Sequence, residues 1–310
     1  MKVALFGGAG GVGSSVAFNL LIGGGPYELV VIDPREHMVV SHVMDLQQVR
    51  EMSPGPSVRK GCPEDLLDAD IVVVSAAVPL TVNSSRMVYL EANAAIVRRL
   101  GALLGPSWPG ILLMVTNPVD PLVTLFQQQT GIERRRVLGY TLNDSLRMRT
   151  GIGDALGVDP GRVDAWAIGE HGDGIVPLFS RVRIDGQPAE LSHEVRDQAL
   201  DFMRGWYRTH VALDSGRSST WTSGLGVARM VRGIAEDAGV LMPVSLMLDG
   251  EYGFAGVSLS VPVTLARGGA KAILEWELAP DEQAGLNAAA DAVRSAAGAA
   301  ARVEPAHDPA

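Results

Sequence analysis

Five short apolar runs, rich in β-branched residues, recur along the first half of the chain. They are Val3–Phe6, Leu29–Ile32, Ile71–Val74, Ile111–Val115 and Arg136–Leu138. Helical stretches lie between several of them, and the clearest are Ser14–Leu21 and Ser85–Leu104. Continuous apolar strands that alternate with helices are typical of a parallel sheet covered on both faces. The pattern predicts an α/β fold, with a doubly wound parallel sheet over residues 1–143.

The pattern changes after about residue 144, where the strands become less regular. We expect strands at Val163–Ile168, Arg181–Ile184 and within Leu241–Val263, with a turn at Asp249-Gly250. The expected helices are His193–His210, Thr220–Ala238 and Asp281–Ala300. This arrangement predicts a mixed α+β substrate domain over residues 144–300. Residues 301–310 are rich in Ala and Pro, and we expect a disordered tail there.

Composition narrows the classes of ligand and location. With 47% apolar and 20% charged residues, the 310-residue chain has the profile of a soluble globular protein. A net charge of −9 argues against nucleic acid as a partner, so we expect a small-molecule ligand. Cys62 is the single cysteine, which excludes an intrachain disulfide and a thiol-rich metal site, and we expect no metal. The apolar runs are too short to span a membrane, and Met1-Lys2-Val3 leads directly into a strand, so we expect a cytoplasmic protein.

A glycine-rich loop follows the first predicted strand and opens the first helix. Its sequence is Gly7-Gly8-Ala9-Gly10-Gly11-Val12-Gly13, which contains Gly8-x-Gly10-x-x-Gly13 and Gly7-x-x-Gly10-x-x-Gly13. Such a turn lets the backbone approach a pyrophosphate, and the helix N-terminus supplies free N–H groups. A glycine triplet alone is also compatible with a turn that binds nothing.

An acidic residue strengthens the interpretation of this loop. Asp33 lies 20 residues after Gly13, at the end of the second predicted strand. A carboxylate there can accept hydrogen bonds from the adenosine ribose and repels a 2′-phosphate, which favours NAD over NADP. Arg35, two residues further on, weakens that preference. Together these features predict a Rossmann-type domain that binds NAD.

Candidate catalytic residues cluster in three segments. His171 stands in the loop Gly169-Glu170-His171-Gly172-Asp173 after an apolar strand, and histidine suits proton transfer to and from a hydroxyl group. The other histidines occur in helix-like, polar or tail contexts, where we expect them to be solvated. Asp144 and Arg147 would share a face if helical, although a local ion pair explains them equally well. Thr116-Asn117-Pro118 could be a turn, but it ends a strand where open α/β sheets place their ligands.

Taken together, these segments resemble the lactate/malate dehydrogenase family over nearly the whole chain. The order and spacing of the motifs make this resemblance specific. They are the glycine loop, Asp33, Ser85-Arg86 with Asn93, Thr116-Asn117-Pro118-Val119-Asp120, Asp144-x-x-Arg147, Gly-Glu-His171-Gly-Asp, and Leu248-Asp249-Gly250-Glu251-Tyr252-Gly253.

The resemblance implies a role for each of these residues. His171 would donate and accept the proton, oriented by Asp144, while Arg86 on a mobile loop would polarise the substrate carbonyl. Arg147 would hold the substrate carboxylate, with Asn117 near the reacting oxygen and Ser219 bordering the substrate. The implied cofactor-binding residues are Gly7, Gly10, Gly11, Val12, Gly13, Asp33, Asn93, Val115 and Asn117. The resemblance also implies a homodimer or homotetramer.

The substrate loop departs from the family pattern. Members that act on malate carry an arginine six residues before the loop arginine, and lactate enzymes commonly carry glutamine, whereas this chain has Leu80. Leucine cannot pair with a second carboxylate, so we expect a 2-oxo acid with an apolar or unusual side chain. Ser223 stands where an apolar residue is more usual, and Arg217 could supply a missing positive charge.

Alternative functions remain open at this point. A shift of register that turns Leu80 away would make the chain a malate dehydrogenase with a rearranged loop. A catalytically silent NAD(H)-binding redox sensor is a different class, but it would not need His171, Asp144, Arg147 and Arg86 together. A related NAD-dependent glycosidase has little support, because Cys62 lies far from the motifs.

Overall fold

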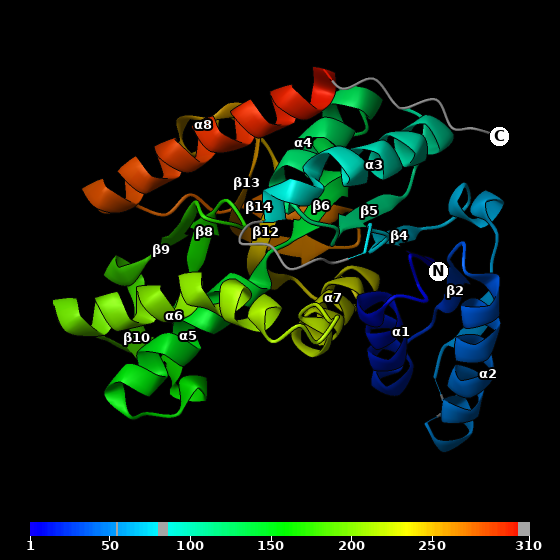
Figure 1. Cartoon of the computed structure of the whole chain (residues 1–310), viewed down its shortest axis with the longest axis horizontal. Helices are drawn as coiled ribbons and strands as arrows, with labels where there is room; N and C mark the ends of the chain where they lie inside the picture. Colours follow the sequence, from blue (N-terminus) through cyan, green and yellow to red (C-terminus); the bar gives the residue numbers. More distant parts are fainter. Residues whose placement is uncertain (54, 80–85, 303–310) are drawn as a thin grey trace.

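A computed structural model of the chain describes every residue except 54, 80–85 and 303–310 (Figure 1). The first half alternates strands with helices, as the apolar runs predict. Its elements are β1 (Lys2–Phe6), α1 (Gly11–Gly23), β2 (Glu28–Ile32), α2 (Glu36–Met52), β3 (Ser57–Lys60), the 3₁₀ turn η1 (Pro63–Leu66), β4 (Ile71–Val74), the 3₁₀ turn η2 (Arg86–Tyr89), α3 (Leu90–Leu104), β5 (Ile111–Met114), α4 (Val119–Thr130) and β6 (Val137–Tyr140).

The second half mixes short strands, long helices and a β-hairpin. Its elements are α5 (Leu142–Leu156), β7 (Val163–Asp164), β8 (Ala167–Gly169), β9 (Ile175–Pro177), β10 (Arg183–Ile184), β11 (Gln187–Pro188), α6 (His193–Ala212), α7 (Thr220–Ala235), β12 (Val240–Asp249), β13 (Ala255–Ala266), β14 (Gly269–Ile273) and α8 (Pro280–Arg302).

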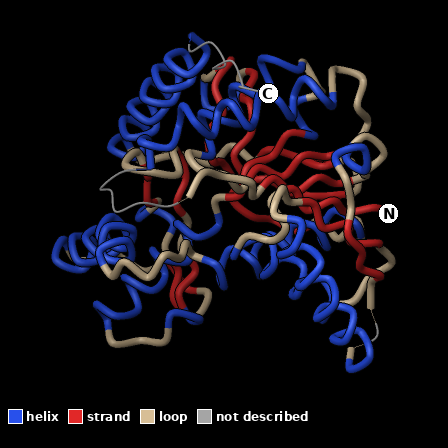
Figure 2. Tube along the Cα trace, turned by 45° about the vertical axis from the view of Figure 1, so that its right-hand side comes forward, coloured by secondary structure: helices blue, strands red, loops and turns tan. Residues whose placement is uncertain are grey.

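An 11-stranded sheet runs through both halves, in the order β3-β2-β1-β4-β5-β6-β12-β13-β8-β9, with β14 beside β13. The first six strands of this order are parallel, and β12 joins β6 antiparallel. Helices α3 and α4 lie on one side of the parallel strands and α1, α2 and α7 on the other (Figures 1 and 2). The order of the strands reverses between β1 and β4, because β2 and β3 lie on one side of β1, and β4, β5 and β6 lie on the other. The carboxyl ends of β1 and β4 therefore form the crevice in which such sheets bind ligands.

The apolar core is divided by the sheet. Leu5, Leu29 and Val73 point to the side covered by α1 and α7, where Val231 of α7 is fully buried. Side chains alternate between the two faces along each strand, so the neighbouring residues, such as Val72 and Leu112, point to the side covered by α3 and α4. A third cluster packs α5 against α6 and includes Met148, Ile152 and Met203. Among the described residues, no helix has both the length and the apolar character needed to cross a bilayer.

Several expected elements differ from those observed. The expected strand Arg181–Ile184 is shortened to β10, because Arg181 ends a 3₁₀ turn. The expected strand Val163–Ile168 is divided, because β7 pairs with β10 in a separate sheet while β8 pairs with β13 and β9. Helix α7 ends at Ala235 rather than residue 238, since Asp237 adopts a left-handed φ of 55°. Helix α8 continues to Arg302, so residues 301 and 302 of the expected tail are helical and the remainder of the tail lies outside the described residues.

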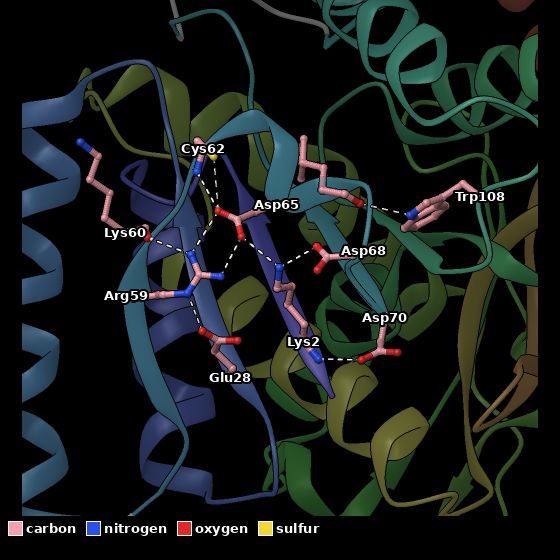
Figure 3. Close-up of polar contacts among 10 residues, drawn as sticks. Lys2, Glu28, Arg59, Lys60, Cys62, Asp65, Asp68, Asp70 and Trp108 are labelled. Atoms are coloured by element: carbon pink, nitrogen blue, oxygen red, sulfur yellow. Dashed lines mark hydrogen bonds and ion pairs between the residues drawn. The ribbon is translucent and has the colours of Figure 1, made fainter.

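Ion pairs tie the amino ends of β1 and β2 to β3 and η1 (Figure 3). The ammonium of Lys2 lies 2.9 Å from Asp65 and 2.6 Å from Asp68. Arg59 lies 2.7 Å from Asp65 and 2.5 Å from Glu28. The hydrogen bond from Arg59 holds the pKa of the Asp65 carboxyl well below its usual range. Lys2 and Glu28 are the first residues of β1 and β2, whereas the glycine loop follows the last residue of β1. The network therefore stabilises the strands without occupying the crevice.

Candidate active site

The loop after β1 packs more closely than any side chain would allow. Gly7 has a φ of 88°, and a Cβ on it would lie 2.3 Å from the backbone nitrogen of Ala76. A Cβ on Gly13 would lie 2.5 Å from the carbonyl oxygen of Gly7. Gly10, which precedes α1, and Gly11, its first residue, line the open side of the loop. The backbone and helix N-terminus are therefore accessible to an anionic ligand.

A groove of about 820 Å³ runs along this loop. Asp33, Pro34 and Arg35 line it after β2, and residues 216–218 with Trp221 form another part of its wall. The Asp33 carboxylate is almost fully buried and accepts a hydrogen bond from the Ala9 amide at 3.3 Å. A groove that combines a glycine loop, a helix N-terminus and a carboxylate at the end of the second strand fits a dinucleotide.

The remaining expected cofactor residues border a second cavity, of about 150 Å³, that leads to His171. Val12, Val115, Asn93 and Asn117 all line it. The buried Asn93 amide accepts a hydrogen bond from the Val78 N–H at 2.9 Å and donates to the Asn117 carbonyl at 2.7 Å. Asn93 thereby braces the segment after β5. The side-chain oxygen of Asn117 is buried and has no hydrogen-bond partner in the described part of the chain, so it can accept one from a ligand.

Helix α5 and the loop after β8 bring the expected catalytic side chains together. Asp144 and Arg147 lie on one face of α5, and Nη1 of Arg147 is 3.3 Å from Oδ1 of Asp144. The other carboxylate oxygen, Oδ2, lies 2.5 Å from Nδ1 of His171. All three side chains are buried. The contact at Nδ1 orients the His171 ring relative to Asp144.

A second carboxylate, which the sequence analysis did not assign, holds the His171 backbone. Oδ2 of Asp120, in the first turn of α4, accepts a hydrogen bond from the His171 N–H at 2.6 Å. Asp120 is completely buried, and burial raises its pKa to about 7. The signal available in the sequence was its place in the Asn117-Pro118-Val119-Asp120 motif, three residues after Asn117.

Helix α6 supplies an aromatic wall that the sequence analysis also missed. The guanidinium carbon of Arg147 lies 4.0 Å from the centroid of a Trp206 ring. His210, one turn later, stacks on Trp206 with ring centroids 4.8 Å apart and planes 10° apart. Trp206, Tyr207, His210 and Val211 line the cavity beside His171. His210, which we expected to be solvated, is half-buried beside Trp206 and lines this cavity.

Hydroxyl groups from the start of α7 form the opposite wall. Asn143 donates to the Ser223 hydroxyl at 2.9 Å and to the Ser219 hydroxyl at 3.4 Å. The Tyr140 hydroxyl donates to the side-chain oxygen of Asn143 at 2.8 Å. Both Ser219 and Ser223 line the cavity. Asn143 and Tyr140 were not singled out, and Asn143 could have been found from its place next to Asp144.

The residues expected to set the substrate's far end are described only in part. Leu80 lies outside the described residues, and Arg86 begins η2. Arg217 lines both the groove and the cavity, but its guanidinium lies over the Trp221 ring, 4.9 Å from the centroid.

Protein-family models match both halves of the chain. Residues 1–139 match the NAD-binding domain of lactate/malate dehydrogenase. Residues 141–302 match the α/β C-terminal domain of the same family.

Individual relatives resemble the chain along almost its full length. The malate dehydrogenase of Halobacterium salinarum is 33% identical over 294 residues, covering 94% of this chain and 96% of that protein. L-lactate dehydrogenase 1 of Bacillus cereus is 32% identical over 285 residues, covering 89% and 91%. Among solved structures, a minor L-lactate dehydrogenase from Enterococcus mundtii superposes with a TM-score of 0.86 at 28% identity, covering 98% of this chain and 99% of that one. The malate dehydrogenase from Aeropyrum pernix gives 0.87 at 28% identity, covering 96% and 98%.

Malate and lactate dehydrogenases thus match this chain to the same degree, in sequence and in structure. The glycine loop and the groove agree with the NAD-binding description of the first half. The chain belongs to the lactate/malate dehydrogenase family and is an NAD-dependent oxidoreductase of 2-hydroxy acids.

Proposed function

We propose that this enzyme interconverts 2-oxo and 2-hydroxy acids that carry an apolar side chain. The observation that carries the proposal is the aromatic wall beside the catalytic pair. Trp206 lies against Arg147, and Trp206, Tyr207 and Val211 line the cavity that contains His171. A substrate whose carboxylate pairs with Arg147 would lie beside these rings, where burial of an apolar substituent is favourable.

The buried side chains of His171, Asp144 and Arg147 would bind the substrate and transfer the proton. Residues 1–143 would hold the coenzyme, and residues 144–300 contain His171, Asp144 and Arg147. The fork of Arg147 suits a bidentate contact with a carboxylate. In reduction, Nε2 of His171 would give a proton to the carbonyl oxygen, while Asp144 fixes the ring through Nδ1 and stabilises its charged form.

Further residues would assist at the reacting carbonyl. Asn117 and Arg86 would donate hydrogen bonds there, and Ser219 would border the substrate. NADH, when bound, supplies the hydride. The glycine loop and Asn93 act before this step, because they shape the groove and brace the segment that contains Asn117.

A malate dehydrogenase is the second candidate, and one observation favours it. Arg204 and Arg208 on α6 line a smaller cavity together with Arg147 and His171, and both are exposed. A cation there could pair with the second carboxylate of oxaloacetate. We favour the apolar substrate because Trp206, Tyr207 and Val211 line the cavity of about 150 Å³ that contains His171, whereas Arg204 and Arg208 line the smaller cavity. Leu80 also replaces the arginine usual in malate enzymes.

The test is NADH oxidation with pyruvate, oxaloacetate, 2-oxoisocaproate and phenylpyruvate. We expect kcat/KM for one of the bulky apolar acids to exceed that for oxaloacetate by about 10-fold or more, because the second carboxylate of oxaloacetate would be placed against the aromatic wall without a partner. The Trp206→Ala variant should lose most of this preference. Arg208→Gln is the matched variant on the same helix and should leave the preference intact. Oxaloacetate as the best substrate, with a selective loss in Arg208→Gln, would establish the malate alternative.

We also propose that two copies of the chain pair through α1, α2 and α7. Large apolar side chains are exposed on each of these helices, and Phe18, Trp221 and Leu225 line one shallow hollow between them. Clustered apolar surface of this kind marks interaction sites, and a symmetric dimer buries the same patch on both subunits.

A further inference from the structure

The turn after β2 presents a cation where the coenzyme's adenosine ribose is expected. Asp33 follows β2 directly, and Arg35 precedes the first residue of α2. Both line the groove of about 820 Å³ along the glycine loop. A Cβ on Gly10 would lie 3.9 Å from Nη2 of Arg35, which places the guanidinium beside the loop.

The Asp33 carboxylate is already occupied by groups of its own chain. Oδ1 accepts hydrogen bonds from the backbone N–H and the Nε of Arg35, at 3.1 and 2.9 Å. Oδ2 accepts from Nη2 of Arg35 at 3.0 Å and from the Ala9 N–H at 3.3 Å. A carboxylate offers about four lone-pair positions, so these four contacts use its capacity. Ribose hydroxyls could reach Asp33 only by displacing Arg35.

The ion pair of Asp33 and Arg35 presents a different charge to the groove than an isolated carboxylate would. Burial alone would raise the pKa of Asp33, but hydrogen bonds from Arg35 and Ala9 outweigh it and lower the pKa, so the carboxylate is ionised. The side chain of Asp33 is 4% exposed, whereas that of Arg35 is 51% exposed. The negative charge is thus covered, and the surface that faces the groove is a guanidinium. Asp33 uses the Nε–H and one N–H of Nη2, which leaves the other N–H of Nη2 and those of Nη1 as donors for a phosphate. An arginine at this position accommodates a 2′-phosphate in dinucleotide-binding folds.

We propose that Arg35 makes the coenzyme groove competent for a 2′-phosphate, so that the enzyme binds NADP(H) as well as NAD(H). In this arrangement Asp33 holds Arg35 in place instead of excluding the phosphate. The proposal depends on dinucleotide binding by the glycine loop and is independent of which 2-oxo acid is reduced.

The test measures binding by calorimetry, with ADP-ribose and 2′-phospho-ADP-ribose as probes that lack the nicotinamide. We expect the wild type to bind the two within about 10-fold of each other. Arg35→Ala should weaken binding of the phosphorylated probe by about 10- to 100-fold, because hydrogen bonds between charged groups are lost. Its affinity for ADP-ribose should be unchanged or higher, since Asp33 becomes available to the ribose. Retained ADP-ribose binding also reports that the variant is folded.

Two further variants complete the experiment. Arg50→Ala removes an exposed arginine from the far end of α2 and should leave both affinities unchanged. Arg35→Lys keeps the charge without the fork and should retain part of the phosphate affinity. A wild type that binds the phosphorylated probe more than about 1,000-fold more weakly would overturn the proposal. An equal loss of both probes in Arg35→Ala would also overturn it, and a wild type that binds neither probe would refute the dinucleotide site itself.

Discussion

At the scale of single residues, His171 is held by two carboxylates that act on different parts of it. Asp144 contacts the ring at 2.5 Å and can balance a positive charge there. Asp120 accepts from the backbone N–H at 2.6 Å and fixes the loop rather than the ring. The first arrangement supports proton transfer, and the second keeps the ring at one place relative to α5.

The burial of Asp120 predicts a pH-dependent stability. Its pKa is raised to about 7, because of burial first and then the nearby negative charges of Glu170 and Asp144. The folded protein therefore binds a proton at Asp120 that the unfolded chain has lost, and the wild type loses stability as the pH rises from about 4 to about 7. Asp120→Asn can still accept from the His171 N–H but carries no charge. Between pH 5 and pH 8 its free energy of unfolding should gain roughly 2–3 kcal/mol relative to the wild type.

Urea unfolding at the two pH values measures this difference. Asp154→Asn, at an exposed position of α5, is the control and should show no such change with pH. If the difference in unfolding free energy between Asp120→Asn and the wild type were the same at both pH values, Asp120 would not be the buried proton-binding group described here.

Residues close in sequence were easier to predict than residues brought together by packing. The three-residue spacing of Asp144 and Arg147 predicted a shared helix face, which α5 provides, and the family resemblance supplied their roles. Trp206 and His210 have the four-residue spacing of a helix, but their role depends on contact between α6 and Arg147 of α5. No local pattern specifies that contact, so the sequence did not assign Trp206 or His210 to the site.

At the scale of elements, the buried parallel strands were the most predictable part of the fold. The runs at Ile71–Val74 and Leu29–Ile32 are strands because every residue in them is apolar and covered on both faces. Strands β7 and β8 were merged into one because they are short and adjacent, and only the tertiary structure assigns them to different sheets. The turn at Asp249-Gly250 was found because it separates two long apolar strands, β12 and β13.

The same reasoning explains which parts of the site were predictable. The glycine loop and Asp33 lie at the ends of adjacent parallel strands, so a strand prediction is enough to bring them together. The bond between Asn93 and the Asn117 carbonyl joins α3 to the segment after β5, and the sequence gives no spacing rule for it. Asn93 was assigned through family resemblance, and its bracing contacts became visible only in the structure.

At the scale of the whole molecule, the exposed apolar surface of α1, α2 and α7 predicts self-association. Phe18 is 45% exposed, Trp221 70% and Leu225 55%, and these side chains adjoin across α1 and α7. We expect a dimer by light scattering at micromolar concentration. Leu225→Arg should shift it towards the monomer, because a charge would be buried unpaired in the interface.

Leu103→Arg introduces the same change at an exposed position of α3, on the other side of the sheet (Figure 1). This control should remain dimeric. A monomeric wild type would contradict the proposed pairing, and loss of the dimer in Leu103→Arg alone would place the interface on the α3 side.

We propose that His171, oriented by Asp144, transfers the proton when a 2-oxo acid is reduced. The most direct measurement is single-turnover oxidation of NADH with the best acid of the panel, for the wild type, His171→Asn and His193→Asn. His193 is exposed at the start of α6 and serves as the matched control. We predict that His171→Asn slows the reaction by about 100- to 10,000-fold with NADH binding unchanged, while His193→Asn keeps the wild-type rate. A His171→Asn variant that reduces the acid at a rate near that of the wild type would show that His171 is not the proton donor.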